Sequence, residues 1–282
     1  MRSVVKSYAG FLLGSVIVLC AAIWMVERGP LLIFWCSALV LVAGLPHGAY
    51  DWVIMRAHYK KGRLGAVVAG YVVLVLVVIA LWLIAPLALL SVFLAYSAYH
   101  FGDSDLPNAS LLHQLTWGLA IIGLPGLFAG ADVQALFSIL TETPIALAPI
   151  SALGIMGCVA AFIHVCFAPK RWVSIGLLAV YGAVCWAAGA LAGFACYFAL
   201  LHSPIHLTRW RHALNQQGSA TILMLSLVVM SAIAGAVWMS ASDPAVTFET
   251  FNQTTFRYTF IALAALTVPH MVLLSKVNRR IH

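Results

Sequence analysis

Apolar runs long enough to cross a lipid bilayer follow one another along the whole chain, with only short polar stretches between them. About 20 apolar residues make one membrane-spanning helix. The sequence therefore predicts spans at residues 8–26, 30–47, 65–84, 86–101, 109–129, 146–168, 172–190, 191–207, 219–241 and 257–275. The junctions at 84–86 and 190–191 are only weakly marked. We predict an all-α fold, a polytopic membrane helical bundle of about ten transmembrane helices.

The low share of charged residues excludes a water-soluble fold. Only 8% of the 282 residues are charged and 63% are hydrophobic, whereas soluble domains carry roughly 25% charged residues. The first apolar run lacks a small-residue cleavage site, so we expect a membrane span there and not a secretory signal. Since no linker, internal repeat or low-complexity tract interrupts the chain, residues 1–282 are expected to form a single multi-pass domain.

The basic residues indicate how the chain is oriented. The net charge of +7 comes from Lys and Arg scattered in short loops, which argues for a membrane protein and against a nucleic-acid partner. If the N-terminus is cytoplasmic, 13 of the 15 Lys and Arg residues lie on the cytoplasmic side of the membrane, and only Arg28 and Arg257 lie on the other side. We therefore predict a protein of the cell inner membrane with both termini in the cytoplasm. The outer loops 130–145 and 242–256 are long enough for short interfacial helices.

Several histidines are predicted to lie at a similar depth in the membrane, and they are the best candidates for functional residues. Ionisable side chains are costly in hydrocarbon and usually serve a function there. His47 lies in GLPHGAYD and His100 in YHFGDSD. His202 and His206 lie in HSPIH, and His270 in VPHM. His47 is expected to end the second span, His100 the fourth, and the pair His202 and His206 the eighth. His270 lies near the end of the tenth span. Even-numbered spans all run from outside to inside, so the five imidazoles should meet near the cytoplasmic face.

The HSPIH segment indicates a metal site. A spacing of four residues places the imidazoles of His202 and His206 on one helix face, where both can reach a single ion. Pro204 between them should bend the helix and free a backbone carbonyl. Imidazoles suit iron, copper, nickel or zinc, so the ligands alone do not choose the metal. His164 is a weaker candidate because no Gly or Asp motif surrounds it.

Two aspartates follow the first two histidines closely. Asp51 and Asp105 could each hydrogen-bond a ligand ring, cap a helix end, or be plain solvated loop residues. Gly48 and Gly102 directly follow His47 and His100, where glycine permits a turn, a close helix approach or a helix stop.

Aromatic residues gather near the same helix ends. Tyr99, Phe101 and Trp210 could line a channel for a flat conjugated hydrocarbon. An aromatic belt at the level of the lipid headgroups is the alternative interpretation.

The PHGAYD, YHFGDSD, HSPIH and PHM segments, taken together, resemble the Brp/Blh family of membrane β-carotene 15,15′-dioxygenases. The resemblance spans Gly44 to Met271. It implies a multi-helix membrane fold, non-haem Fe(II), and central cleavage of β-carotene or a related carotenoid with O₂ to two molecules of retinal. Position by position, it implies that the iron ligands are His47, His100, His202 and His206, with His270 either a fifth ligand or a supporting group. The expected partners are a lipid-soluble carotenoid, O₂ and membrane lipid.

Two other functions stay open at this stage. A transporter or channel could use histidines and aspartates inside the membrane to pass a transition-metal ion or protons. It would need polar groups at several depths, whereas those of the motifs crowd the cytoplasmic end. A membrane desaturase with two irons would want HxxHH clusters, and this chain has one HxxxH and no HxxHH.

Overall fold

The computed structural model describes residues 2–24, 30–213 and 247–281, together with short pieces between 224 and 239. The predicted span 219–241 lies mostly outside the described residues. The side chains of His47 and Trp210 and the surroundings of Gly48 also lie outside the described part, although the backbone at all three positions is helical.

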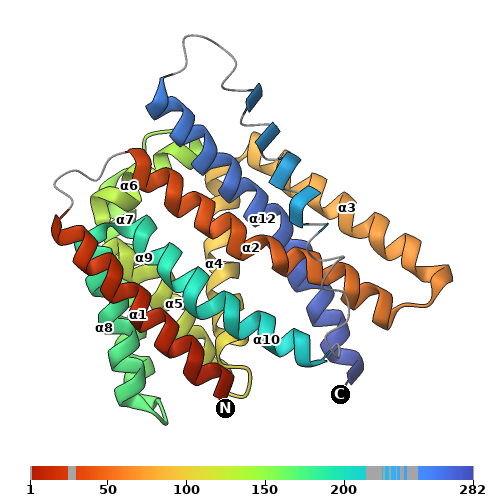
Figure 1. Ribbon diagram of the computed structural model, residues 1–282, viewed down its shortest axis with the longest axis horizontal. Helices are drawn as coiled ribbons and strands as arrows, with labels where there is room; N and C mark the ends of the chain where they lie inside the picture. Colours follow the sequence, from red (N-terminus) through yellow and green to blue (C-terminus); the bar gives the residue numbers. More distant parts are fainter. Residues whose placement is uncertain are drawn as a thin grey trace.

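Every regular element among the described residues is a helix (Figure 1). In chain order these are α1 (Arg2–Trp24), α2 (Pro30–His58), α3 (Lys61–Ile84), α4 (Pro86–Asp105), α5 (Leu111–Phe128), α6 (Gly130–Thr141), α7 (Leu147–Phe167), α8 (Arg171–Ala188), α9 (Ala190–Tyr197), the π-helix η1 (Phe198–His202), α10 (Ser203–Ala213) and α12 (Phe248–Ile281).

Seven helical segments of the described part are long and apolar enough to cross a membrane. They are Leu32–His58, Lys61–Ile84, Leu111–Phe128, Leu147–Phe167, Arg171–Ala188, Ala190–Arg209 and Phe248–Val277. Two of the other predicted spans fall on a shorter apolar helix, Lys6–Ala22, and on α4, and the third, 219–241, lies mostly outside the described residues. On α3, large apolar side chains such as Leu76 and Leu83 are exposed, and lipid is the solvent that suits them. The prediction of a multi-pass helical membrane protein is confirmed, with the number of spans approximate.

Several helices continue past their predicted ends. The prediction that His47 ends a helix is wrong, because α2 runs on to His58. α4 reaches Asp105 and α10 reaches Ala213. The polar residues that suggested a helix end are buried against neighbouring helices instead of facing water: Asp51 is 1% exposed and Asp105 is 8% exposed. The predicted outer loop 130–145 does contain a short helix, α6.

Helices α2 and α12 lie side by side and run in the same direction (Figure 1). The rings of Phe34 and Phe251 stack near the start of both helices. Further along, Asp51 of α2 bonds His270 of α12. At the end where both helices begin, Glu142, just after α6, pairs with Arg257 of α12. These contacts fix the two helices in register and tie α6 to them.

A π-helical turn interrupts the helix that carries the HSPIH segment. In η1 the Ser203 N–H donates to the carbonyl of Phe198, five residues earlier. Pro204 follows immediately and has no N–H to donate, so the regular hydrogen-bond ladder cannot continue through this point. Single π-helical turns inside α-helices often occur at functional sites. The turn places His202 and His206 on either side of the change in helical register.

Candidate metal centre

Four buried histidines from three separate stretches of the chain converge on one point. His100 comes from α4, His202 from the π turn, His206 from α10 and His270 from α12, and none is more than 5% exposed. The ring centroid of His100 lies 5.1 Å from that of His202 and 5.6 Å from those of His206 and His270. The centroids of His206 and His270 are 5.1 Å apart. The helices therefore bring these imidazoles into one cluster inside the bundle.

Three of these imidazoles, His100, His206 and His270, meet the geometric requirement for a shared ion. Each offers one ring nitrogen, and these nitrogens lie within 4.8 Å of one another. Two nitrogens bound to one ion at roughly 2.0–2.1 Å lie at most about 4.2 Å apart, so the three rings would have to close in around the ion. The ring of His202 lies beside this trio, stacked at 6.0 Å on His206. A buried His triad that could bind a metal is thus present among the described residues.

A chain of two hydrogen bonds orients His270. Its Nδ1–H donates to Oδ1 of Asp51 at 2.6 Å, because an ionised carboxylate can only accept. The other oxygen of Asp51 accepts from the hydroxyl of Tyr71 on α3 at 2.8 Å. A carboxylate on one ring nitrogen fixes the tautomer and makes the opposite nitrogen, Nε2, a stronger ligand.

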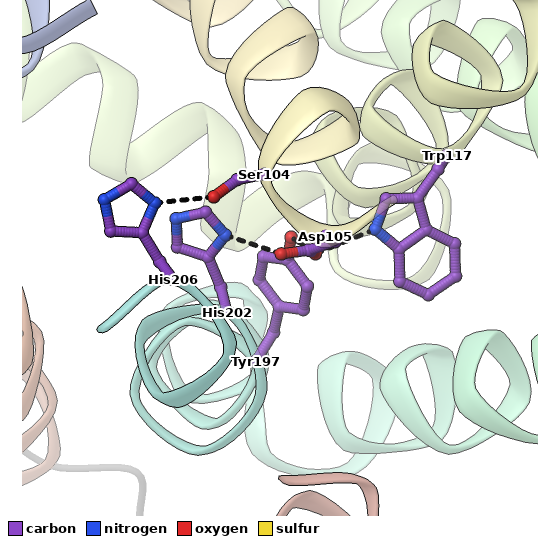
Figure 2. Close-up of polar contacts among 6 residues, drawn as sticks. All are labelled: Ser104, Asp105, Trp117, Tyr197, His202 and His206. Atoms are coloured by element: carbon purple, nitrogen blue, oxygen red, sulfur yellow. Dashed lines mark hydrogen bonds and ion pairs between the residues drawn. The ribbon is translucent and has the colours of Figure 1, made fainter. Parts of the chain in front are cut away.

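Asp105 orients His202 in the same way (Figure 2). Nδ1 of His202 donates to Oδ1 of Asp105 at 2.8 Å. The second carboxylate oxygen accepts from the indole N–H of Trp117 at 2.9 Å and from the hydroxyl of Tyr197 at 2.6 Å. A buried carboxylate needs such donors because it has lost its water. All three partners hold Asp105 rigidly behind the ring.

Ser104 completes the set of supports. Its hydroxyl shares a 2.6 Å hydrogen bond with Nδ1 of His206 (Figure 2). Ser104 and Asp105 are consecutive on α4, and they reach the two histidines on the neighbouring helix (Figure 2). For three of the four imidazoles, Nδ1 is thus engaged by the protein, which leaves Nε2 as the metal-binding nitrogen.

The donor set fits a divalent transition metal. Neutral imidazoles are good ligands for iron, copper, nickel and zinc. The nearby carboxylates of Asp51 and Asp105 would offset part of the charge of such an ion in this buried place. The residues present are therefore consistent with a metal cofactor.

Of the other predicted site residues, Phe101 reaches the cluster and lines the cavity described below, whereas the rest lie apart from it or outside the described side chains. The side chains of His47 and Trp210 lie outside the described part of the structure. Phe101 contacts the ring of His202, with centroids 4.8 Å apart. Tyr99 is 39% exposed and does not line the cavity described below. His164 instead bonds the carbonyl of His113 and the hydroxyl of Ser174, away from the trio.

A large apolar cavity begins at the histidines. His100 and His270 form part of its wall, and its empty volume, including the space at its mouth, is about 1270 Å³. Helices α2, α4, α5, α6 and α12 contribute most of the lining. On α12 the lining extends from His270 back to Phe256, which corresponds to about 21 Å along the helix axis. Ligand pockets are typically apolar with few polar groups, and this one suits a long hydrocarbon.

A polytopic helical membrane protein with a buried histidine centre and an adjoining apolar cavity is the class that this fold and site define. Residues 38–278 match the family model described as Beta-carotene 15,15'-dioxygenase, and the chain belongs to that family. It is similar to a curated protein named "Beta-carotene 15,15'-dioxygenase" from Uncultured marine bacterium 66A03. The two are 32% identical over 275 residues, covering 89% of this chain and 96% of the relative. No solved structure matches the chain significantly.

Proposed function

We propose that this protein is an iron-dependent dioxygenase that cleaves β-carotene or a related carotenoid at its central 15,15′ double bond with O₂, giving retinal. Family membership supports carotenoid cleavage. In this chain the main support is that the histidine trio lies at the wall of a long apolar cavity. His100 and His270 belong to both the trio and the cavity lining.

Iron is the metal that we propose for the site. Zinc has no redox chemistry and cannot take part in a reaction with O₂. The resemblance of the four histidine segments to Brp/Blh enzymes indicates Fe(II). In this proposal His100, His202, His206 and His270 hold the ion, and His47 remains a predicted ligand. Bound iron would supply the binding and activation of O₂.

The protein's own residues would position and protect the reacting groups. Asp51 and Asp105 hold the imidazoles of His270 and His202 in fixed tautomers, and Ser104 orients the ring of His206. The apolar walls would align a polyene so that its central double bond lies beside His100 and His270. They would also exclude water from the site of cleavage. Lipid is also the solvent in which such a substrate dissolves, so a membrane site avoids extracting it.

The transporter alternative finds less support. A path for ions or protons needs polar groups at successive depths. Among the described residues, the cavity wall is almost wholly apolar away from His100 and His270. Ser97, Tyr181, Thr259 and Thr267 are the uncharged polar residues in that part of the lining.

The proposal can be tested with purified, iron-loaded protein in detergent, β-carotene and O₂ labelled with heavy oxygen. Both product aldehydes should carry one labelled oxygen atom, with no reductant consumed, because the two atoms of O₂ enter the two halves of the broken double bond. The aldehydes are reduced to alcohols at once so that their oxygen cannot exchange with water. Label in only one product would indicate a monooxygenase. Carotenoids left intact would refute cleavage altogether.

A further inference from the structure

A threonine hydroxyl in the wall of the apolar cavity has no hydrogen-bond partner. Thr259 of α12 lines the cavity and is 1% exposed. Its hydroxyl oxygen Oγ1 makes no hydrogen bond. Leaving a buried hydroxyl unsatisfied costs free energy, so such a group calls for an explanation, and a bound ligand can supply the missing partner.

Neighbouring threonines on the same helix show that this situation is not a general property of α12. Thr255 donates its hydroxyl to the carbonyl of Phe251 at 2.9 Å, and Thr267 donates to that of Leu263 at 2.7 Å. This bond to the preceding turn is the usual way in which a helical threonine satisfies itself. Thr259 lacks it, and its hydroxyl is available to the contents of the cavity.

The position of Thr259 relative to His270 fits the proposed substrate. The two residues are 11 positions apart on α12, which places them about 16 Å apart along the axis and within about 20° of each other around it. Both therefore face the cavity from the same side of the helix. This separation is comparable to one half of an extended carotenoid, from its central double bond to its terminal ring.

We propose that Thr259 is a specificity-determining residue that binds an oxygen substituent on the terminal ring of the carotenoid, so that a ring-hydroxylated carotenoid is preferred to the pure hydrocarbon. This inference rests on the proposed function and adds a ring-recognition site to it. With the central double bond beside His270, the ring lies at the depth of Thr259. A ring hydroxyl then satisfies Oγ1, whereas a hydrocarbon ring leaves it without a partner. Sites built to hydrogen-bond a substrate discriminate against analogues that lack the group.

The test compares β-carotene with β-cryptoxanthin, which carries one hydroxyl on one ring. We expect the wild-type protein to favour β-cryptoxanthin by on the order of tenfold in kcat/KM. Thr259→Val, of nearly the same shape, should reduce the ratio to about one, and Thr259→Ser should retain most of it. Thr267→Val serves as the matched control within the cavity. Its hydroxyl is already bonded to the helix, so the ratio should stay at the wild-type value.

Binding without turnover gives a second readout. Titration of metal-free protein with each carotenoid in the absence of O₂, followed by absorbance, should show the same preference and the same loss in Thr259→Val. The variant should fold, because valine removes a buried hydroxyl that has no partner, and its Tm should match or exceed that of the wild type.

The outcomes separate this inference from the proposed function. If the wild type cleaves β-carotene but shows no preference, or if Thr259→Val keeps the preference, the ring-recognition site is refuted and the cleavage function stands. If neither carotenoid is cleaved, the proposed function fails. The oxygen-free titration then still decides whether Thr259 recognises a ring hydroxyl.

Discussion

At the residue scale, the hydrogen bonds to Nδ1 define what each imidazole can do at its other nitrogen. His202, His206 and His270 are each supported by a different side chain, and each support comes from another helix. An imidazole held in this way presents Nε2 in a fixed direction before any metal arrives. The centre is therefore organised mainly by long-range side-chain contacts.

His270 is expected to be a metal ligand in its own right. Its replacement by alanine removes one of three nitrogens that lie within 4.8 Å of one another, so we expect His270→Ala to lose most of its bound iron. Metal analysis of purified protein measures this. His58→Ala is the control, because His58 bonds the carbonyl of Ile54 on its own helix and should keep full iron. Stoichiometric iron in His270→Ala would show that His270 only supports the other ligands.

Asp51 and Asp105 should affect the metal centre indirectly, through the histidines that they hydrogen-bond, and not as metal ligands themselves. We expect Asp51→Asn and Asp105→Asn each to lower metal affinity or activity by roughly 10- to 100-fold, since losing the partner of a ligand typically costs that much. Chelator competition measures the affinity. Tyr71→Phe removes only the outer hydrogen bond to Asp51 and should have a smaller effect. An equal loss in Tyr71→Phe would mean that the hydroxyl, not the carboxylate, controls His270.

The sequence predicted these carboxylates as possible partners of ligand rings, but it could not predict which rings they would meet. Asp51 is four residues from His47 in the chain, yet the ring it contacts belongs to His270, 219 residues away. Ser104, Tyr71, Trp117 and Tyr197 were not predicted as supporting residues. Only Ser104 had a local signal, its place inside YHFGDSD. The other three depend on how helices distant in sequence pack, which local spacing does not encode.

At the scale of the elements, close contacts between helices place the motif residues. A Cβ atom on Gly102 would lie 2.0 Å from the backbone oxygen of Gln114, and one on Gly118 would lie 1.7 Å from that of Ala98. Helices α4 and α5 therefore touch through their backbones, as small residues in membrane helices allow. Of the roles predicted for Gly102, a close helix approach is the one that the structure contains.

Alanine at Gly118 should push α4 away from α5 and disturb Ser104 and Asp105. Overpacking typically costs about 1–3 kcal/mol, so we expect Gly118→Ala to lower Tm in detergent and to reduce bound iron. Gly176→Ala on α8 is the matched control, because nothing lies within 4 Å of a Cβ there. Alanine is the better helix former, so this control should be neutral or slightly stabilising. An unchanged Tm in Gly118→Ala would show that the two helices can separate without cost.

Sequence periodicity predicted the helices better than it predicted their ends. Buried polar residues such as Asp51 resemble a helix end when only the sequence is read, because the alternative requires partners from other helices. The π turn before Pro204 was anticipated only as a bend with a freed carbonyl. The exact register change could not be predicted, because tertiary contacts such as the bond from Ser203 to the carbonyl of Ala43 contribute to it.

At the scale of the whole molecule, the distribution of charge predicts the orientation in the membrane. The start of α1 and the end of α12 lie at the same edge of the molecule (Figure 1), which supports an even number of crossings. α6 lies near the opposite edge, where α2 and α12 begin (Figure 1). The positive-inside rule would place the edge with both chain ends in the cytoplasm.

Two cysteine substitutions at exposed positions test this orientation in intact cells. Thr143 follows α6 and Lys61 begins α3, and both are exposed. With a maleimide that cannot cross the membrane, Thr143→Cys should be labelled in intact cells, whereas Lys61→Cys should react only after lysis. The wild-type chain, whose six cysteines all lie on helices, measures the background. Because the basic residues are concentrated on the side of Lys61, the opposite labelling pattern would mean that the chain is inserted the other way round. Labelling of both positions in intact cells would mean that the segment between them crosses the membrane an even number of times.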